Sequence, residues 1–424
     1  MKIRYSNPRQ PGGSVLIVGL VIAGILGVSL LSYLSLVHGQ NVSVIRAQAW
    51  NAALVMAESG VEEALAQLNP GALVTNILAN NGWTLIDGFY QPGPPTRNLI
   101  GGYYQVGYTP SAPPIIYATG YTTVPAISAT IQRRVEVKTA SAPLFGVGVV
   151  AKYNITMNGN NVATDSYDSI DSIHSTGGLW DSSKWMTNGD IASTYGFVNV
   201  GNGDVNGRLL LGPTASGSVG AQGYVTGGVV HDFNVDFPDV LVPFSTGADP
   251  RDGQNYTLTG GNTTTNYYYY AGDLKPANNS KLTVTGNAVL YVTGSFIMNQ
   301  NATILIATNA SLKLFVGGPS APNTSTTFGQ ITNYNTAASF QYYGLPNNTS
   351  ITLVGNENFV GTIYAPNADF TASGGGTIKR NADIQGAVVV NSITMNGYFK
   401  LHYDENLRRI GPLRGYVAIS WKEF

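Results

Sequence analysis

A twelve-residue segment, GVVAKYNITMNG at residues 148–159, returns late in the chain as GAVVVNSITMNG at residues 386–397. Seven of the twelve positions are identical when the two copies are aligned in register. A weaker third copy, GSFIMN, occupies residues 294–299. Internal repetition of short apolar segments is typical of folds in which similar units stack on one another. The repeat therefore predicts stacked β structure over most of the chain.

Short apolar segments lie between the copies, and turns containing Asn or Gly divide many of them. They are Val289–Val292, Ile304–Ile306, Leu312–Val316, Ile351–Val354 and Ile363–Tyr364. Such segments favour a right-handed parallel β-helix, because each turn exposes an apolar face until the next turn covers it. Asn side chains at equivalent corners can then hydrogen-bond to one another along the stack. The spacing of the repeats is irregular, so a β-sandwich or jelly roll is the alternative.

Charge is scarce in this chain, and its two signs are balanced. Charged residues make up 11% of the sequence, against about 25% in an ordinary soluble domain. The chain has 22 Lys and Arg against 23 Asp and Glu, a net charge of −1. This balance argues against nucleic acid as a partner, because phosphate binding requires a basic surface. The chain has no cysteine, which excludes disulfides, thiolate zinc sites and cysteine nucleophiles.

An uncharged run of 23 residues, VLIVGLVIAGILGVSLLSYLSLV, extends from Val15 to Val37. As a helix it would be about 34 Å long, enough to cross a bilayer once. Three basic residues, Lys2, Arg4 and Arg9, precede it. The positive-inside rule therefore predicts a cytoplasmic N-terminus, with the bulk of the chain periplasmic or extracellular. The alternative is a cleaved secretory signal, but the run is longer than the usual apolar core of such a signal.

The helix is expected to continue beyond the apolar run, because residues 41–68 contain no proline and only Gly60 as a breaker. Leu54, Val61 and Leu68 recur at a spacing of seven. Together with Ala57, Ala64 and Leu65 they predict a face that packs on a sheet or on neighbouring copies. Aromatic and β-branched segments follow and predict a small sheet that needs the helix to cover its apolar face. The strand-like segment at residues 416–424 is expected to return and pair with this sheet.

A short basic leader ending in Gly12 and Gly13 is followed by Ser14, a long apolar helix and AESGVEEALAQL at residues 57–68. Together these features resemble the N-terminal region of minor pilins and pseudopilins, most closely the PilX-like group of pilus-assembly proteins. The resemblance implies cleavage after Gly13 by a prepilin peptidase and packing of the helix against other pilin subunits. One departure is Val18, where the family usually has a glutamate. Minor pilins that sit at a filament tip also lack this glutamate.

The C-terminal half carries a second resemblance. GTIYAPNAD at residues 361–369, GAVVV at 386–390 and HYDENL at 402–407 resemble a C-terminal domain often joined to PilX-like N-termini in bacterial surface proteins. The resemblance spans residues 144–408 and implies a β-helix-like fold without established catalytic residues. The same group often carries a stretch like DSYDS, found here at residues 165–169.

Two polar clusters in this region are candidate sites. Asp165, Asp168 and Asp171 recur at a spacing of three, and as hard oxygen ligands they are candidates to bind Ca2+. The alternative, which we favour, is a solvated polar turn. His402 and the acids that follow it either supply acid–base chemistry or, as we favour, cap the end of the β-helix.

Two further segments are candidates for a binding surface. Tyr267, Tyr268, Tyr269 and Tyr270 either stack on surface glycans or pack along a strand, and we favour packing. Residues 213–253, rich in Gly, Ser, Pro and Asp, predict a long excursion over one face of the β-helix.

The sequence thus predicts five parts and a mainly structural role. The parts are a leader (1–13), a transmembrane and amphipathic helix (14–70), a pilin-like α+β head (71–141), a β-helix-like domain (142–408) and a C-terminal strand (409–424). We expect a membrane-anchored, surface-exposed structural or adhesive component of a type IV pilus or type II secretion-like pseudopilus, in the inner (cytoplasmic) membrane. The alternative is a membrane-tethered carbohydrate-active enzyme. Glycoside hydrolysis needs two carboxylates at a defined separation, and no acids at convergent spacing stand out, so we expect no enzyme and no cofactor.

Overall fold

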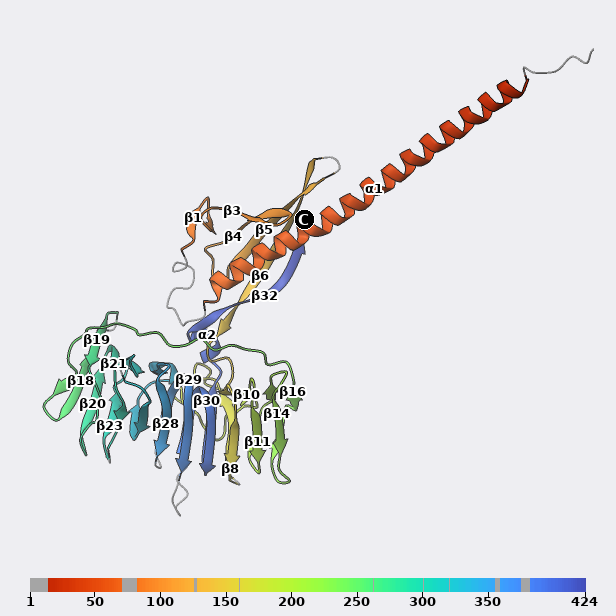
Figure 1. Ribbon diagram of the computed structural model, residues 1–424. Coiled ribbons are helices and arrows are strands. Elements are labelled where there is room, and N and C mark those ends of the chain that lie inside the picture. The colour runs from red at the N-terminus through yellow and green to blue at the C-terminus, as the bar shows by residue number, and fades with distance from the viewer. Residues whose placement is uncertain are drawn as a thin grey trace, which may run out of the picture. The chain divides into compact units, whose positions relative to one another are not determined.

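The protein is mainly β, with one long N-terminal helix (Figure 1). The computed structural model describes residues 14–70, 82–125, 128–159, 161–261, 263–299, 301–319, 321–354, 359–374 and 382–424. The chain divides into two compact units. The unit that we call the head contains the helix as far as Gln67, the segment Leu78–Ala140 and the C-terminal residues Val417–Phe424. The unit that we call the β unit contains Leu68–Ile77 and Ser141–Tyr416.

Helix α1 (Ser14–Leu68) is one uninterrupted helix of 55 residues, about 80 Å long. Its apolar stretch is exposed, with Leu16, Leu26 and Leu31 all more than half accessible. By length and composition this stretch can cross a membrane. The helix ends just before Pro70, as expected, because the proline ring disfavours helical backbone in the preceding residue.

The sheet of the head has seven strands in the order β1-β2-β4-β5-β6-β32, with β3 also paired to β4. The strands are β1 (Thr84–Ile86), β2 (Phe89–Gln91), β3 (Thr96–Leu99), β4 (Gly102–Tyr108), β5 (Ile115–Val124), β6 (Ala129–Pro143) and β32 (Leu413–Glu423). The ladders from β1 to β6 are antiparallel. The C-terminal strand β32 lies at the edge beside β6, and the backbone N–H of Phe424 donates to the carbonyl of Arg134 at 2.9 Å. The expected return of this strand to the sheet of the head is confirmed.

A stripe of mostly small residues on α1 packs against this sheet. Its buried members are Ala49, Ala53, Ala57, Val61, Ala64 and Leu68, spaced three or four residues apart. The approach is close at Gly120 of β5, where an added Cβ would lie 2.0 Å from the carbonyl oxygen of Ala53. The predicted stripe was partly wrong, because Leu54 and Leu65 are only half-buried. Small side chains allow the closest approach, so Leu54 and Leu65 lie at the flanks of the contact.

The β unit begins with parallel strands that stack in three columns. Strand β10 pairs with β7 and β13, and β13 pairs with β16. In the same way β11 lies between β8 and β14, and β12 lies between β9 and β15. The strands are β7 (Val149–Ala151), β8 (Ile155–Asn158), β9 (Ala163–Tyr167), β10 (Ile191–Ser193), β11 (Phe197–Gly201), β12 (Asp204–Val205), β13 (Leu209–Leu211), β14 (Ser216–Val219), β15 (Tyr224–Val225) and β16 (Val229–Val230). Each set of three strands therefore pairs in parallel with the set before it, and we call such a set a turn of the stack.

A second run of turns builds up from the opposite end of the stack. Its ladders lead from β19 through β21, β24, β27 and β29 to β30, with further columns alongside. The strands of this run that belong to the same sheet as β7 are β19 (Thr265–Tyr270), β21 (Asn287–Val292), β22 (Phe296–Ile297), β24 (Ser311–Val316), β25 (Thr324–Phe328), β27 (Phe340–Gly344), β28 (Asn348–Val354), β29 (Phe359–Gly374), β30 (Ala382–Gly397) and β31 (Phe399–Asp404). A separate five-stranded sheet contains β17 (Arg251–Asp252), β18 (Asn255–Thr259), β20 (Lys281–Thr285), β23 (Thr303–Ile306) and β26 (Gln330–Asn333). The short helices η1 (Ala337–Ser339) and α2 (Leu407–Ile410) complete the unit.

The two runs meet at the first turn of the chain. Strand β30 pairs with β7 and β8, and β31 pairs with β9, all in parallel. We call this contact the seam. The first turn, β7–β9, therefore lies inside the stack, with later parts of the chain on both sides of it (Figure 1). Buried aliphatic and aromatic side chains from both runs form one continuous apolar core.

The sequence repeat marks the seam. Ile155, Met157 and Asn158 pair in register with Ile393, Met395 and Asn396, the matching residues of the other copy. The Asn158 amide donates to Oδ1 of Asn396 at 3.1 Å. The predicted hydrogen bond between stacked asparagines is thus confirmed at this pair.

The predicted excursion at residues 213–253 was partly wrong. Strands β14, β15 and β16 fall within it and continue the columns of β11, β12 and β13. Their Gly- and Ser-rich segments become strands because a preceding turn supplies the hydrogen-bonding partners. The irregular part is residues 231–250, which lead from β16 to β17 and carry the buried side chains of Phe237 and Val240 (Figure 1).

Candidate functional site

The N-terminal processing residues flank the beginning of α1. Ser14 is the first residue of the helix, whereas Gly12 and Gly13 lie outside the described residues. From Val15 to Val37 no residue is buried, and the most hydrophobic window of the helix has none of its residues covered by the rest of the chain. A surface of this kind is stable in lipid or against other apolar helices, but not in water.

The second half of α1 is held to the sheet of the head by a carboxylate. Arg97 on β3 donates from Nε and Nη2 to Oε1 of Glu63, at 3.0 and 2.9 Å. The hydroxyl of Tyr104 on β4 donates to Oε2 at 2.9 Å. Partial burial, together with the charge and hydrogen bond of Glu63, raises the pKa of Tyr104 to about 12. Glu63 is therefore fully engaged within the chain.

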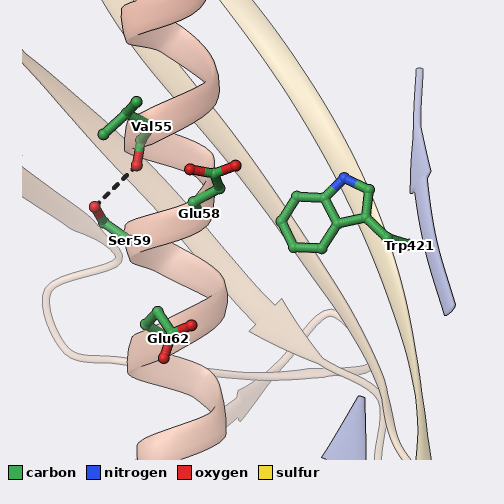
Figure 2. Close-up of a pocket in the computed structure, with 5 residues that line it drawn as sticks. All are labelled: Val55, Glu58, Ser59, Glu62 and Trp421. Carbon is green, nitrogen blue, oxygen red and sulfur yellow. Dashed lines mark hydrogen bonds between the residues drawn. The ribbon is translucent and has the colours of Figure 1, made fainter. Parts of the chain in front are cut away.

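A groove lies on another side of α1, next to the C-terminal strand. Val55, Glu58, Ser59, Glu62 and Trp421 line a cavity of about 410 Å³. Figure 2 shows the indole of Trp421 on β32 facing the helix on the side of Glu58. Glu58 and Glu62 are exposed, and among the residues that the structure describes neither has an ion-pair partner. The groove thus combines two uncompensated carboxylates with an aromatic face.

The DSYDS and HYDEN stretches meet at the seam, in register. His402 pairs with Asp165, Tyr403 with Ser166, and Asp404 with Tyr167. His402 is fully buried, and its Nδ1 shares a hydrogen bond of 2.6 Å with Oδ1 of Asp165. The two stretches named by the resemblance are therefore one structural feature.

A second carboxylate and an indole complete the surroundings of His402. Oδ2 of Asp383 on β30 lies 3.8 Å from Nε2 of His402. The Trp180 ring stacks on the imidazole with a centroid separation of 3.7 Å and an interplanar angle of 22°. Burial alone would lower the pKa of His402, but the hydrogen bond to Asp165 and the charge of Asp383 outweigh it and raise that pKa. The imidazolium is therefore favoured between two carboxylates.

Unpartnered polar atoms gather in the same region. Among the described residues, five buried side-chain atoms have no hydrogen-bond partner: Tyr167 Oη, Trp180 Nε1, Asp383 Oδ1, His402 Nε2 and Asp404 Oδ2. All five belong to β9, β30, β31 or the loop that follows β9. Unpaired buried polar atoms cost free energy of folding, so this region contributes less to stability than the apolar core does.

The three candidate Ca2+ ligands do not lie together. Asp165 faces His402, but Asp168 accepts from Arg409 at 2.6 and 2.7 Å, and Asp171 binds His174 at 2.9 Å. The three carboxylates have separate partners because only Asp165 lies in a strand, and no group of three metal-ligating side chains occurs among the described residues. The prediction that His402 and the acids after it cap the end of the β-helix was wrong, since β31 lies between β30 and β9 within the stack.

The four tyrosines of β19 differ in exposure. Tyr268 is buried, and its hydroxyl contacts the backbone of Thr259. Tyr267 is half-exposed and makes an edge contact with Phe244, while Tyr269 does so with Tyr291. The predicted packing is therefore confirmed for Tyr268, and glycan stacking by the others stays a prediction.

Sequence reasoning missed two partners of His402. Trp180 lies in the loop after β9, and Asp383 lies at the start of β30. Neither is close to His402 in the sequence, so only the register of the seam brings them together. The two sequence repeats could have predicted this contact. They indicate that β30 pairs with β8, and the strands that follow each of them, β31 and β9, then pair as well.

Comparisons with known proteins give limited matches. Residues 244–410 match the model of a family described as "Domain of unknown function (DUF7305)". No curated protein matches the chain. Among solved structures, the chain is similar to the "competence-associated pilin ComZ from Thermus thermophilus", with 13% identity over 88% of this chain and 97% of that chain. The TM-score is 0.28, too low to support an inference about this chain.

Proposed function

We propose that this protein is a membrane-anchored minor pilin-like component of a type IV pilus or pseudopilus, with a structural or adhesive and non-catalytic role. The observation that carries the proposal is the continuity of α1. One helix begins with an exposed apolar run long enough to cross a membrane and ends with a stripe packed on an antiparallel sheet. Such a helix can hold a globular head at a fixed distance from lipid or from a filament axis.

The apolar run also has features that suit packing against other helices. Gly19, Gly24 and Gly27 are exposed and carry no side chain, so the backbones of neighbouring helices can approach closely there. The basic residues that precede the run support a cytoplasmic N-terminus and an outward-facing head and β unit. The partners would be the inner membrane, a prepilin peptidase and other pilin subunits.

We further propose that the stacked turns of the β unit form a parallel β-helix. The parallel ladders in consecutive columns and the buried apolar core support this architecture. Its outer faces would be displayed at the cell surface, where half-exposed tyrosines such as Tyr267 could stack on glycans.

The N-terminus of the mature protein tests the anchoring step. The full chain is co-expressed with a prepilin peptidase, and intact-mass and N-terminal peptide spectra are recorded. We expect the mature chain to begin at Ser14, and Gly13→Val to leave the leader attached. Gly12→Ala is the matched control and should be processed normally. A chain that begins near Gln40 would indicate ordinary secretion, and one that begins at Met1 would indicate an uncut anchor.

The cellular role is tested by deletion in the natural host. Loss of assembled pili or of adhesion is expected, with restoration by the full chain but not by the Gly13→Val variant. Normal pili together with lost polysaccharide turnover would instead support the membrane-tethered enzyme and overturn the proposal.

A further inference from the structure

Three side chains from distant parts of the β unit form a row of hydrogen bonds. Lys152 directly follows β7, Asn367 lies within β29, and Asp239 belongs to the irregular segment at residues 231–250. Nζ of Lys152 donates to Oδ1 of Asn367 at 3.4 Å. Nδ2 of Asn367 in turn donates to Oδ1 of Asp239 at 2.6 Å. A carboxamide therefore lies between an amine and a carboxylate.

The segment that carries Asp239 is anchored on both sides of this residue. The side chains of Phe237 and Val240 are buried. The carbonyl of Pro238 accepts a hydrogen bond from the hydroxyl of Tyr364 at 2.6 Å, and Tyr364 belongs to the same strand as the amide. These contacts hold the carboxylate of Asp239 beside the amide.

The backbone also fixes the lysine and the amide. The N–H of Lys152 donates to the carbonyl of Val390 at 3.0 Å. Asn367 lies in the part of β29 where the register with β30 shifts, between Ala365 and Asp369. The side chains of Lys152 and Asn367 are both partly buried, which restricts the access of water to them.

The three groups have the chemistry needed for an exchange of amide bonds. The neutral amine of a lysine is a nucleophile, and the Cγ of an asparagine carboxamide is an electrophile. Fixing the two next to each other replaces an encounter between free molecules with an intramolecular step, which can be favoured by many orders of magnitude. A carboxylate at the leaving nitrogen can carry the proton that must move there.

We propose that Nζ of Lys152 and Cγ of Asn367 become joined by an isopeptide bond, with Asp239 as the proton carrier. The neutral amine attacks Cγ, the Nζ–Cγ bond forms, and the Cγ–Nδ2 bond breaks. Asp239 takes one proton from Nζ and passes it to Nδ2, which leaves as ammonia. The carbonyl oxygen stays on Cγ, and neither an oxidant nor a reductant takes part. The product differs from the starting chain by the loss of one ammonia.

The new bond ties together the two runs of turns. Strand β30 pairs with β29 and with β7, so it lies between them in the sheet. A bond from Lys152 to Asn367 therefore passes across β30 and closes the seam covalently. The chain has no cysteine, so a disulfide cannot do this. The inference concerns the β unit alone and goes beyond the proposed function. A displayed domain closed in this way resists unfolding, because the cross-link restricts the unfolded chain.

Intact-mass spectrometry of the full chain, purified in detergent, tests the bond. We expect the natural chain to be lighter by one ammonia than the mass calculated for its sequence and observed N-terminus. Proteolysis should release the peptides that contain Lys152 and Asn367 as one branched species. Lys152→Arg and Asn367→Ala should retain the ammonia. Lys275→Arg is the matched control, because Lys275 pairs directly with the carboxylate of Asp273 at 2.9 Å, and it should lose ammonia as the natural chain does.

The variant Asp239→Asn tests the proton carrier. Loss of general acid–base assistance slows a step of this kind by about 100-fold or more. The variant should therefore have the full mass when freshly purified and lose ammonia only on prolonged incubation. Ammonia loss at the natural rate would overturn the part assigned to Asp239.

A second reaction also releases ammonia from an asparagine, and Lys152→Arg separates the two. In that reaction the backbone nitrogen of the next residue attacks Cγ and forms a cyclic imide, which needs no lysine. Ammonia loss in Lys152→Arg, or a natural chain with the full mass of its sequence, would overturn the isopeptide bond. Either result would leave the proposed function standing, because anchoring is tested at the N-terminus.

Discussion

At the scale of single residues, the seam depends on a buried histidine between two carboxylates. Asp165 and Asp383 approach opposite nitrogens of His402, so the imidazolium compensates charge that would otherwise be buried unpaired. Removing one partner of a buried ion pair leaves an uncompensated charge, which commonly costs about 3–5 kcal/mol. The seam should therefore be sensitive to the protonation of this one side chain.

The first prediction follows from the raised pKa of His402. A histidine whose pKa is higher in the folded state adds stability below its unfolded value of about 6.5, and that stability is lost as pH rises through the folded value. The free energy of unfolding, measured by urea titration with tryptophan fluorescence, should fall over that range. His402→Gln should lower it by about 3 kcal/mol at pH 6 and flatten the pH dependence. His174→Gln is the control, because His174 and its partner Asp171 are partly exposed, and it should change little. An unchanged pH profile in His402→Gln would contradict the role of this ion pair.

The sequence identified only part of this site. Asp165 and His402 were both singled out, but as members of two separate clusters. Their contact depends on strand register across more than two hundred residues, which local patterns do not contain. The resemblance had named both stretches without giving a reason that they belong together. The structure gives that reason, since they stack as β9 and β31.

At the scale of elements, the helix was predictable and its packing was less so. The uncharged run and the absence of proline after it predicted one long helix, and α1 is that helix. The heptad pattern drew attention to Leu54, yet Ala53 and Ala57 make the closest contacts. Hydrophobicity ranks leucine above alanine, whereas the separation between helix and sheet is set by the smallest side chains. The complementary glycine, Gly120, could not be recognised before the strand was placed.

The second prediction concerns this close approach. A Cβ on Gly120 would lie 2.0 Å from the oxygen of Ala53 and 2.4 Å from the nitrogen of Ala57, both backbone atoms that cannot move aside. Gly120→Ala should therefore separate α1 from β5 and destabilise the head by about 2–3 kcal/mol. Limited proteolysis within residues 82–140, followed by mass spectrometry, would measure the loss. Gly107→Ala in β4 is the control, because its nearest contacts are at 3.2 Å and its effect should be smaller. Equal protection of the two variants would contradict the proposed packing.

At the scale of the whole molecule, the order of the turns in space differs from their order in the chain. Apolar segments and Asn-containing turns predicted stacked strands, but not that the first turn lies inside the stack. The sequence repeat indicates that the first turn lies next to β30. Its two copies are the most alike because β8 and β30 pack directly on one another, where matched side chains give an even stack. Similarity between distant segments was evidence of contact between them.

The last prediction uses the boundary of the matched family region. Residues 244–410 contain the run from β17 to β31 but lack β7, β8 and β9, the partners of β30 and β31 at the seam. A fragment with these bounds would expose unpaired strand edges and much of the apolar core, both of which favour aggregation. We expect it to be insoluble or to elute as large oligomers in size-exclusion chromatography. The fragment Ser141–Tyr416, which is the whole β unit apart from residues 68–77, should elute as a monomer and unfold cooperatively. If the shorter fragment were monomeric with the same thermal midpoint, the seam would be dispensable, and the first turn would be an addition to a self-sufficient stack.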